Sequence, residues 1–441
     1  MAQDHAPAPA TGLMPLLPIL SINFVGTLGF SIVLPFLVFL VADWGGNAIV
    51  FGILASTYSA FQLIGAPILG RWSDRFGRRR VLLLSQIGTL VSWIIFLAAF
   101  LLPADTLLSV DSALLGQFTL TLPLLVLFIA RATDGLTGGN VSVANAYLAD
   151  ITDESHRTEN FGRMAVSTNA GFILGPALAG LLGATVYGAV LPVIAALVIS
   201  AVATLMIQFG LRESRVNLLD AKPGMQNACK VFGQETKECY QLKGCDDTSS
   251  ASILKLPHMP ALLAVNFLVM LGFSFFYVAF PTHAALGLNW SVTDAGTFFA
   301  VLSLLMVVVQ GPILARLAAV VPETVLVVGG CIILAAGFAL LLNGDTAFVY
   351  AAGGLIALGN GLMWPTFMAM LSRLSGERLQ GAVQGLASSM GAAASIAGLI
   401  AGGLIYTWVG PWVFVLSALT IAAAAALASA FPGSASASAQ H

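Results

Sequence analysis

The sequence contains very little charge. Only 9% of its 441 residues are Asp, Glu, Lys or Arg, 58% are hydrophobic, and the mean hydropathy is +0.93. A typical soluble domain carries about 25% charged residues, and a soluble chain of this size could not hide so much apolar surface, whereas lipid can solvate it. The net charge of −2 also lacks the basic excess of a nucleic-acid-binding protein. The composition therefore predicts an all-α integral membrane protein.

Cysteine is scarce and irregularly spaced. Cys229, Cys239 and Cys245 follow a C-x9-C-x5-C spacing rather than the paired C-x2-C of a zinc site, and only His258 lies near them. We favour reduced thiols over a metal site, and we expect no metal and no cofactor. The first twelve residues contain no Lys or Arg, so we expect them not to form a signal peptide and the apolar run after them to be a retained helix.

Long apolar segments dominate the remainder of the chain. A spanning helix needs about 20 mostly apolar residues, and the sequence predicts twelve such helices in two six-helix halves. They lie near 14–42, 48–70, 80–102, 119–149, 160–184, 188–211, 259–287, 293–318, 324–342, 346–372, 380–407 and 409–431. The predicted organisation is a tail (1–13), a first half (14–212), a polar linker (213–258), a second half (259–431) and a second tail (432–441).

The distribution of positive charge tests this topology independently. If both termini are cytoplasmic, 17 of the 18 Lys and Arg residues fall in cytoplasmic loops, and the remaining one, Arg131, lies inside a helix. This is the pattern of the positive-inside rule. Trp44, Trp290, Trp408 and Trp412 fall at the opposite, outer interface, as an aromatic belt would. We therefore expect a multi-pass cell-membrane protein whose termini and linker are cytoplasmic.

Short motifs recur between the halves. Residues 28–31 (LGFS) reappear at 271–274, and 67–71 (PILGR) match 312–316 (PILAR), at offsets of 243 and 245 residues. Two matches at nearly one offset indicate duplication. Six-helix parallel repeats are a transporter architecture, with the substrate site near the middle of the membrane between the halves.

The loop between the second and third helices carries a specific motif. Residues 70–80 read GRWSDRFGRRR and resemble the G-x-x-x-D-R-x-G-R-[KR] signature of the major facilitator superfamily. The resemblance implies that the loop latches the halves in the outward-facing state. The alternative is a plain positive-inside loop, which requires the arginines but neither the acid nor the glycine spacing. The second copy has Ala319 and Pro322 where Asp74 and Gly77 stand. The latch residues implied by the resemblance are Gly70, Asp74, Arg75, Gly77, Arg78 and Arg79.

The fourth helix carries two charges in its middle. Residues 131–140 read RATDGLTGGN and resemble the R-x-x-x-G motif of the same family. A charge in the hydrocarbon core is costly and is by default a functional hypothesis. Arg131 and Asp134 share a helix face at i,i+3 spacing and could pair. Desolvation and the neighbouring cation would act on the carboxyl in opposite directions, so we expect this pair to carry the coupling proton. The alternative is a buried structural ion pair.

The fifth helix resembles the motif of drug/proton antiporters. Gly171, Gly175, Pro176 and Gly180 match G-x-x-x-G-P-x-x-G-G, with Ala179 in place of one glycine. With residues 28–35 and 145–152, this makes the chain similar to the tetracycline-resistance branch of the superfamily. Ordinary packing of small residues is the alternative explanation. The chain departs from that branch because its helices 1, 3 and 9 lack acids in mid-membrane.

The helices that line the cleft in this fold supply candidate substrate contacts. Amphiphilic substrates require aromatic walls and a few polar anchors, although simple helix packing would explain the same residues. The candidates are Asn23, Phe30, Gln62, Asn140, Asn266, Phe273, Tyr277, Gln310, Asn360 and Trp364.

We thus expect a secondary active transporter, a monomer in the lipid bilayer that exports small amphiphilic organic compounds in exchange for protons by alternating access. The alternative within transport is uptake or facilitated passage of an organic anion, with Arg131 as its anchor. The sequence contains no nucleophile–base or metal cluster, so we expect no enzymatic activity.

Overall fold

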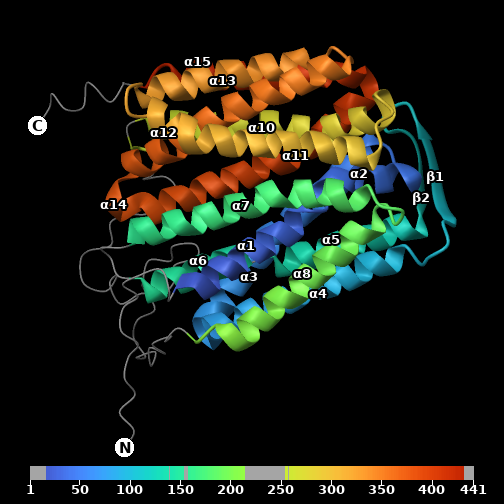
Figure 1. Ribbon diagram of the computed structural model, residues 1–441, viewed down its shortest axis with the longest axis horizontal. Coiled ribbons are helices and arrows are strands. Elements are labelled where there is room, and N and C mark those ends of the chain that lie inside the picture. Colours follow the sequence, from blue (N-terminus) through green and yellow to red (C-terminus); the bar gives the residue numbers. More distant parts are fainter. Residues whose placement is uncertain (1–15, 139, 153–156, 214–253, 257, 432–441) are drawn as a thin grey trace, which may run out of the picture.

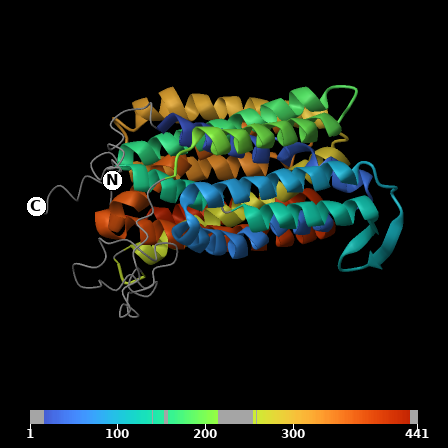
Figure 2. The ribbon, with the colours of Figure 1, turned by 90° about the horizontal axis from the view of Figure 1, so that it is seen from below.

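The computed structural model describes residues 16–431 apart from 139, 153–156, 214–253 and 257. The predicted tails and the three linker cysteines lie outside the described residues. Its helices run side by side along one long axis, and a β-hairpin projects from one end (Figures 1 and 2). We call this the hairpin end, and we call the opposite end, which carries loop 70–80, the arginine end.

The first half contains eight described helices and two strands. These are α1 (Leu17–Ser31), α2 (Leu34–Asp43), α3 (Ala48–Phe76), α4 (Arg78–Ala99), β1 (Thr106–Ser112), β2 (Gly116–Thr121), α5 (Leu122–Thr137), α6 (Asn140–Ile151), α7 (Arg157–Gly183) and α8 (Val190–Gly210).

The second half is helical throughout its described part. Its elements are α10 (Met259–Thr282), a π-helical turn (His283–Gly287), α11 (Val292–Val308), a second π-helical turn (Val309–Ile313), α12 (Leu314–Leu317), α13 (Glu323–Leu340), α14 (Thr346–Val409), a 3₁₀ turn (Gly410–Trp412) and α15 (Val413–Ala428).

Two of the predicted spans are broken in the middle. The first divides into α1 and α2, with Pro35 in the opening turn of α2, where a missing N–H costs no helical hydrogen bond. The fourth divides into α5 and α6 at Gly138, which caps α5. Such breaks place backbone groups inside the protein rather than in lipid.

Nine helical segments of the described chain are long and apolar enough to cross a membrane. Each of the twelve predicted segments nonetheless falls mainly in helix within its described residues. Leu386–Ala428 covers most of two of them, and neither the shorter Leu17–Gly29 nor the broken α5 and α6 meets the length criterion.

The structure differs from the prediction between the tenth and eleventh spans. The sequence predicted two helices with a short connection, whereas α14 is helical over all its 64 residues. Gly344 beside its start approaches Leu288, and Trp408 near its end contacts the hairpin, so both ends lie at the hairpin end. The helix therefore turns back on itself between two arms. The sequence around this turn contains no proline to end the helix.

The strands were not predicted. β1 and β2 pair antiparallel from Ser112 opposite Gly116 to Thr106 opposite Thr121, with an irregularity between Thr106 and Leu108. The predicted third and fourth spans leave residues 103–118 as their connection, and β2 runs three residues into the predicted fourth span. The hairpin lies beyond the ends of the helices, where its polar backbone is not exposed to lipid (Figure 1).

Among the described residues, the two halves share a buried core at the hairpin end. At the hairpin end, Phe36, Leu37 and Phe51 of the first half pack in one buried cluster with Val278 and Ala295 of the second. At the arginine end, the buried cluster around Leu69, Tyr147 and Ile207 contains only first-half residues among those the structure describes. The described helices are thus packed together at the hairpin end and form separate cores toward the arginine end.

Candidate functional site

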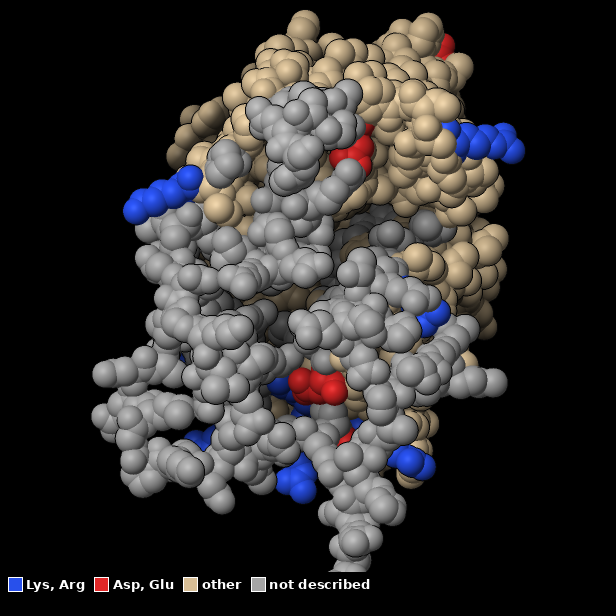
Figure 3. Space-filling view, turned by 90° about the vertical axis from the view of Figure 1, so that its left-hand side faces the viewer, with Lys and Arg blue, Asp and Glu red and all other residues tan. Residues whose placement is uncertain are grey.

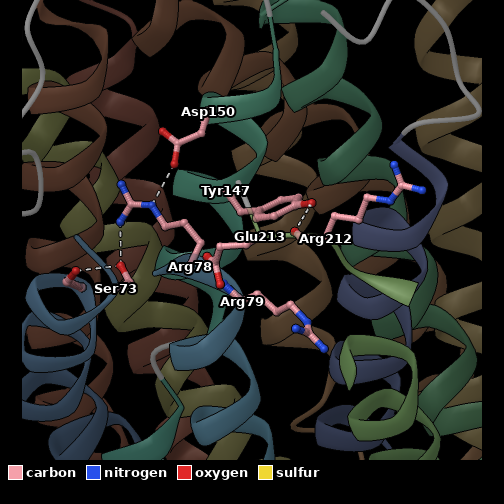
Figure 4. Close-up of polar contacts among 8 residues, drawn as sticks. Ser73, Arg78, Arg79, Tyr147, Asp150, Arg212 and Glu213 are labelled. Atoms are coloured by element: carbon pink, nitrogen blue, oxygen red, sulfur yellow. Dashed lines mark hydrogen bonds and ion pairs between the residues drawn. The ribbon is translucent and has the colours of Figure 1, made fainter. Parts of the chain in front are cut away.

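The arginine loop is held by an ion pair to the far end of the fourth span. Arg78 donates from Nε to Asp150 Oδ2 at 2.9 Å and from Nη1 to Ser73 Oγ at 2.6 Å, so one guanidinium joins α3, α4 and α6 (Figure 4). The two side chains of the ion pair are 11% and 18% exposed. A planar guanidinium can make both bonds at once, and an ammonium group cannot reproduce that geometry.

A second acid binds the same loop from the end of the sixth span. Glu213 Oε1 accepts a hydrogen bond from the backbone N–H of Arg79 at 3.0 Å, in the first turn of α4. Arg79 in turn donates to the carbonyls of Ile207 and Gln208 on α8. A carboxylate at a helix N-terminus is stabilised by the unsatisfied N–H groups and the helix dipole. Sequence reasoning missed Glu213, and its position directly after an apolar span was the available signal.

Gly77 permits this approach. Its φ of +102° is strained for any other residue, and a Cβ there would lie 2.8 Å from the carboxylate of Glu213. Among the other predicted latch residues, Gly70 is half-buried with open space around it, and the exposed Arg75 lies 5.4 Å from the Phe76 ring. The side chain of Asp74 lies outside the described residues.

Basic side chains gather at this end of the molecule. Seen from the arginine end, Lys and Arg project around the edge of both halves (Figure 3). This agrees with the sorting of charge in the sequence, in which those loops all fall on one side.

The predicted pair in the fourth span is buried. Arg131 Nη1 lies 3.8 Å from Asp134 Oδ2, and the two side chains are 3% and 5% exposed. The guanidinium also lies 5.4 Å from the centre of the Tyr58 ring on α3, and Thr89 on α4 makes a side-chain hydrogen bond with Asp134. Attraction between a cation and a ring face is strengthened when the cation is desolvated. Tyr58 and Thr89 were not predicted, because nothing in the sequence shows which neighbouring helix faces the pair.

This buried pair is linked to the break in the fourth span. Gln62 Nε2 donates to the Tyr58 hydroxyl at 3.1 Å and to the Gly138 carbonyl at 2.8 Å. Ser85 on α4 donates to the carbonyl of Thr137. The carbonyls left unsatisfied where α5 ends are therefore bound by side chains of α3 and α4. A change in the position of Arg131 or Asp134 would therefore alter the contacts of Tyr58 and Gln62 at the end of α5.

Two predicted substrate contacts fasten helices within one half. Asn23 Nδ2 donates to Met164 O, Ser167 Oγ and Thr168 Oγ1 on α7. Asn266 donates to Ala387 O on the second arm of α14 at 2.9 Å. Both residues are buried.

The remaining candidates lie mostly in the second half. Phe273 and Tyr277 are neighbours on α10, with ring centres 6.0 Å apart, and Tyr277 is 47% exposed. Asn360 and the half-buried Trp364 lie one turn apart on α14, and Asn360 Nδ2 is 3.9 Å from Met306 Sδ. Gln310 is half-buried in a π-helical turn. The side chains of Phe30 and Asn140 lie outside the described residues.

The antiporter motif makes close contacts between helices. Cβ atoms on Gly171 and Gly175 would come within 3 Å of α1, at Thr27 and Ser31. A Cβ on Gly180 would meet the backbone of Gly296 on α11, in the other half, at 2.7 Å. Pro176 lies buried inside α7. The motif thus packs α7 against both its own half and the opposite one.

Titratable groups elsewhere are few. The described residues include no group of three or more His, Cys, Asp or Glu that could hold a metal, and Cys331 is a buried thiol. His283 is buried in the π-helical turn after α10, with Nδ1 3.1 Å from the Tyr406 hydroxyl. Within the described chain, its Nε2 has no hydrogen-bond partner.

Comparisons with known proteins agree with this geometry. A sequence model of the Major Facilitator Superfamily matches residues 19–233 and 262–439. Tetracycline resistance protein class E of Escherichia coli is 28% identical over 406 residues, which cover 90% of each chain. Multidrug resistance protein 2 of Bacillus subtilis (strain 168) is 24% identical over 393 residues, covering 88% of each. Among solved structures, a D-xylose–proton symporter superposes with a TM-score of 0.67 at 13% identity, covering 95% of this chain and 98% of that one.

Proposed function

Because the chain belongs to the major facilitator superfamily, we propose that it exports small amphiphilic organic compounds in exchange for protons by alternating access. The family makes it a membrane transporter. Resemblance to tetracycline and multidrug resistance proteins over most of the chain supports drug efflux. The observation that carries the proton step is the buried Arg131–Asp134 pair.

The substrate would bind between the halves, against α10 and the first arm of α14. The corresponding spans, Met259–Gly287 and Thr346–Leu371, are the most enclosed of the described candidate spans, at 56% and 50% buried. We infer that an exposed side chain on such an enclosed helix faces the space between the halves rather than lipid. Tyr277 is such a residue; Phe273 adds aromatic surface one turn away on α10, and Trp364 adds aromatic surface on α14. Gln62, Gln310 and Asn360 supply amides as polar anchors, whereas Asn23 and Asn266 position helices.

The proton would be carried by Asp134. Burial favours the neutral carboxyl and the adjacent guanidinium favours the carboxylate, so the proton affinity depends on the distance between them. Gln62 bonds both the Tyr58 hydroxyl on α3 and the Gly138 carbonyl at the end of α5, so a movement of α3 relative to α5 would change the surroundings of the pair. Both helices belong to the first half, so the proposed step is a rearrangement within that half, which would give Asp134 a different proton affinity in the inward-facing and outward-facing states.

Uptake of an organic anion receives less support. Arg131 is 3% exposed and already lies beside Asp134 and the Tyr58 ring. A guanidinium enclosed in this way is not presented to a substrate in the space between the halves.

The decisive experiment uses proteoliposomes with an acidic interior and labelled tetracycline outside. Asp134→Asn should abolish accumulation driven by the pH gradient while retaining substrate exchange without a gradient. Asp105→Asn, an exposed acid next to the hairpin, is the matched control and should pump normally. If Asp134→Asn still accumulates substrate uphill, the proton carrier lies elsewhere, with Asp43, Asp150 and His283 the next residues to replace.

The charge distribution supports a cytoplasmic arginine end, termini and linker. We also propose that the chain acts as a monomer in the cell membrane. A membrane-impermeant thiol reagent applied to intact cells should leave Cys239 unlabelled and should label Val186→Cys, at the exposed hairpin end. Rapid labelling of Cys239 in sealed cells would show that the linker is outside the cell and that the proposed orientation is wrong.

A further inference from the structure

The β-hairpin is hydrogen-bonded to three residues of the first half, which are Trp44, Gly45 and Asn47. The Thr119 N–H donates to the Gly45 carbonyl at 2.8 Å, and the Thr121 hydroxyl donates to the Trp44 carbonyl at 2.8 Å. Asn47 Nδ2 donates to the Leu115 carbonyl at 2.8 Å, while its Oδ1 caps α3 by accepting from the Val50 N–H. The hairpin therefore moves with α2 and α3.

The turn of the same hairpin reaches the second half. The Trp408 indole N–H, near the end of α14, donates to the Leu114 carbonyl at 2.9 Å, across 294 residues of sequence. Gly116 in this turn has a φ of +71°, and a Cβ there would lie 2.8 Å from the Thr407 methyl group. The hairpin turn thus makes both a hydrogen bond and a close contact with the opposite half.

These contacts lie at the hairpin end, where α14 of the second half packs against α3 of the first and α11 packs against α7. Alternating access requires these surfaces to separate. On one side, a Cβ on Gly403 of α14 would lie 2.5 Å from the Ala48 carbonyl of α3. On the other side, α7 meets α11 at Gly180 and Gly296. Packed helix surfaces of this kind have discrete arrangements rather than a continuous range. Because the hairpin is bonded to the first half, opening of the hairpin end would separate the Trp408 indole from the Leu114 carbonyl.

We propose that residues 106–121 form a clasp that stabilises closure of the hairpin end, with Trp408 as the residue that it holds. The proposal rests on alternating access but not on the identity of the substrate or on proton coupling. It gives Trp408 a role distinct from a residue of the aromatic belt, because the role depends on the indole N–H and not on the ring.

The test measures the distance between the halves at the hairpin end. Spin labels at Val186→Cys and Thr346→Cys place one exposed probe in each half, in the full chain with its native cysteines replaced and reconstituted in phospholipid nanodiscs. Trp408→Phe keeps an aromatic ring and removes the donor. Asn47→Asp keeps the oxygen that caps α3 and removes the donor to Leu115. Trp412→Phe is the control, at an exposed tryptophan four residues further along the same end.

Loss of one such hydrogen bond should raise the ratio of long-distance to short-distance populations by about two- to tenfold. We expect this rise for Trp408→Phe and for Asn47→Asp, and parental distances for Trp412→Phe. Unchanged distances in Trp408→Phe, an equal shift in Trp412→Phe, or no shift in Asn47→Asp would each overturn the clasp. If the parent transports no tetracycline while the expected shifts occur, the proposed substrate is wrong and the clasp stands.

Discussion

The two six-helix halves share short sequence motifs, yet their interiors are built from different side chains. The first half encloses a charged pair and a hydrogen-bonded arginine loop. The described core of the second half contains a cluster of packed phenylalanines, with the Phe280 ring stacked on Phe276 at 5.3 Å between ring centres and tilted against Phe298 at 4.4 Å. Ala319 and Pro322 stand in the second half where Asp74 and Gly77 stand in the first.

This difference suggests a division of labour. Buried charges respond to protonation and to small changes in distance, because their interaction is strong where water is excluded. Aromatic rings supply large apolar contact area with few rotatable bonds. The first half is therefore suited to switching and the second to holding an apolar substrate. If this comparison is correct, substitutions in the first half will alter coupling, and substitutions in the second will leave coupling unchanged.

Arg131→Met should have the largest effect on uphill transport and on stability. It removes the cation beside Asp134 and leaves a buried carboxyl without its partner, which typically costs about 3–5 kcal/mol of unfolding free energy. We expect uphill transport to be lost and the thermal unfolding of the purified protein to occur at a clearly lower temperature. Arg316→Met, at the exposed equivalent of Arg71 in the second half, should change neither.

A second variant separates stability from coupling in this prediction. Arg131→Met combined with Asp134→Leu removes both charges, so most of the lost stability should return while uphill transport stays absent. If Arg131→Met unfolded at the same temperature as Arg316→Met, the Arg131–Asp134 pair would not stabilise the protein. The proposed difference between the two halves would then be wrong.

Arg78→Lys should have the next largest effect. Lysine keeps the positive charge, so topology is preserved, but it cannot bond Asp150 and Ser73 together as the guanidinium does. Losing one charge-assisted bond at this partly buried site should lower the initial transport rate about tenfold, with normal insertion into the membrane. Arg80→Lys, exposed in the same loop, is the control. Equal transport rates in the two variants would mean that the loop only sets the orientation of the protein in the membrane and does not act as a latch.

The fold was predictable from the sequence because lipid imposes a simple rule on composition and span length. The predicted family and fold class are confirmed by the family match and by the similar solved structures. The hairpin was missed because a search for apolar spans gives no weight to a short polar connection. The tenth and eleventh spans were predicted as separate helices with a short connection, whereas the helical assignment continues through the polar turn between them.

The candidate site was less predictable. Arg131 and Asp134 could be paired from their spacing, because three residues along a helix bring two side chains onto one face. Tyr58 and Thr89 could not be found, since each comes from a helix whose rotation the sequence does not fix, whereas Glu213 was missed although it follows directly after an apolar span. Asn266 illustrates the opposite problem, because polarity within a span is compatible with a ligand contact and with a bond to Ala387 of a neighbouring helix.

Tyr406→Phe should have the smallest effect and tests the second half directly. The Tyr406 hydroxyl lies 3.1 Å from His283 Nδ1, and no other hydrogen-bond partner of that ring is seen in the described residues. Removing the hydroxyl should lower the unfolding free energy by about 1 kcal/mol, because phenylalanine retains the packing of the ring. The dependence of transport on pH should match the parent, since the proposed carrier is Asp134 in the other half. Tyr187→Phe, an exposed tyrosine at the same end, should be indistinguishable from the parent in both measurements. A shift in the pH dependence of Tyr406→Phe alone would make His283 a titrating group in the transport cycle, and the division between a switching half and a binding half would then be wrong.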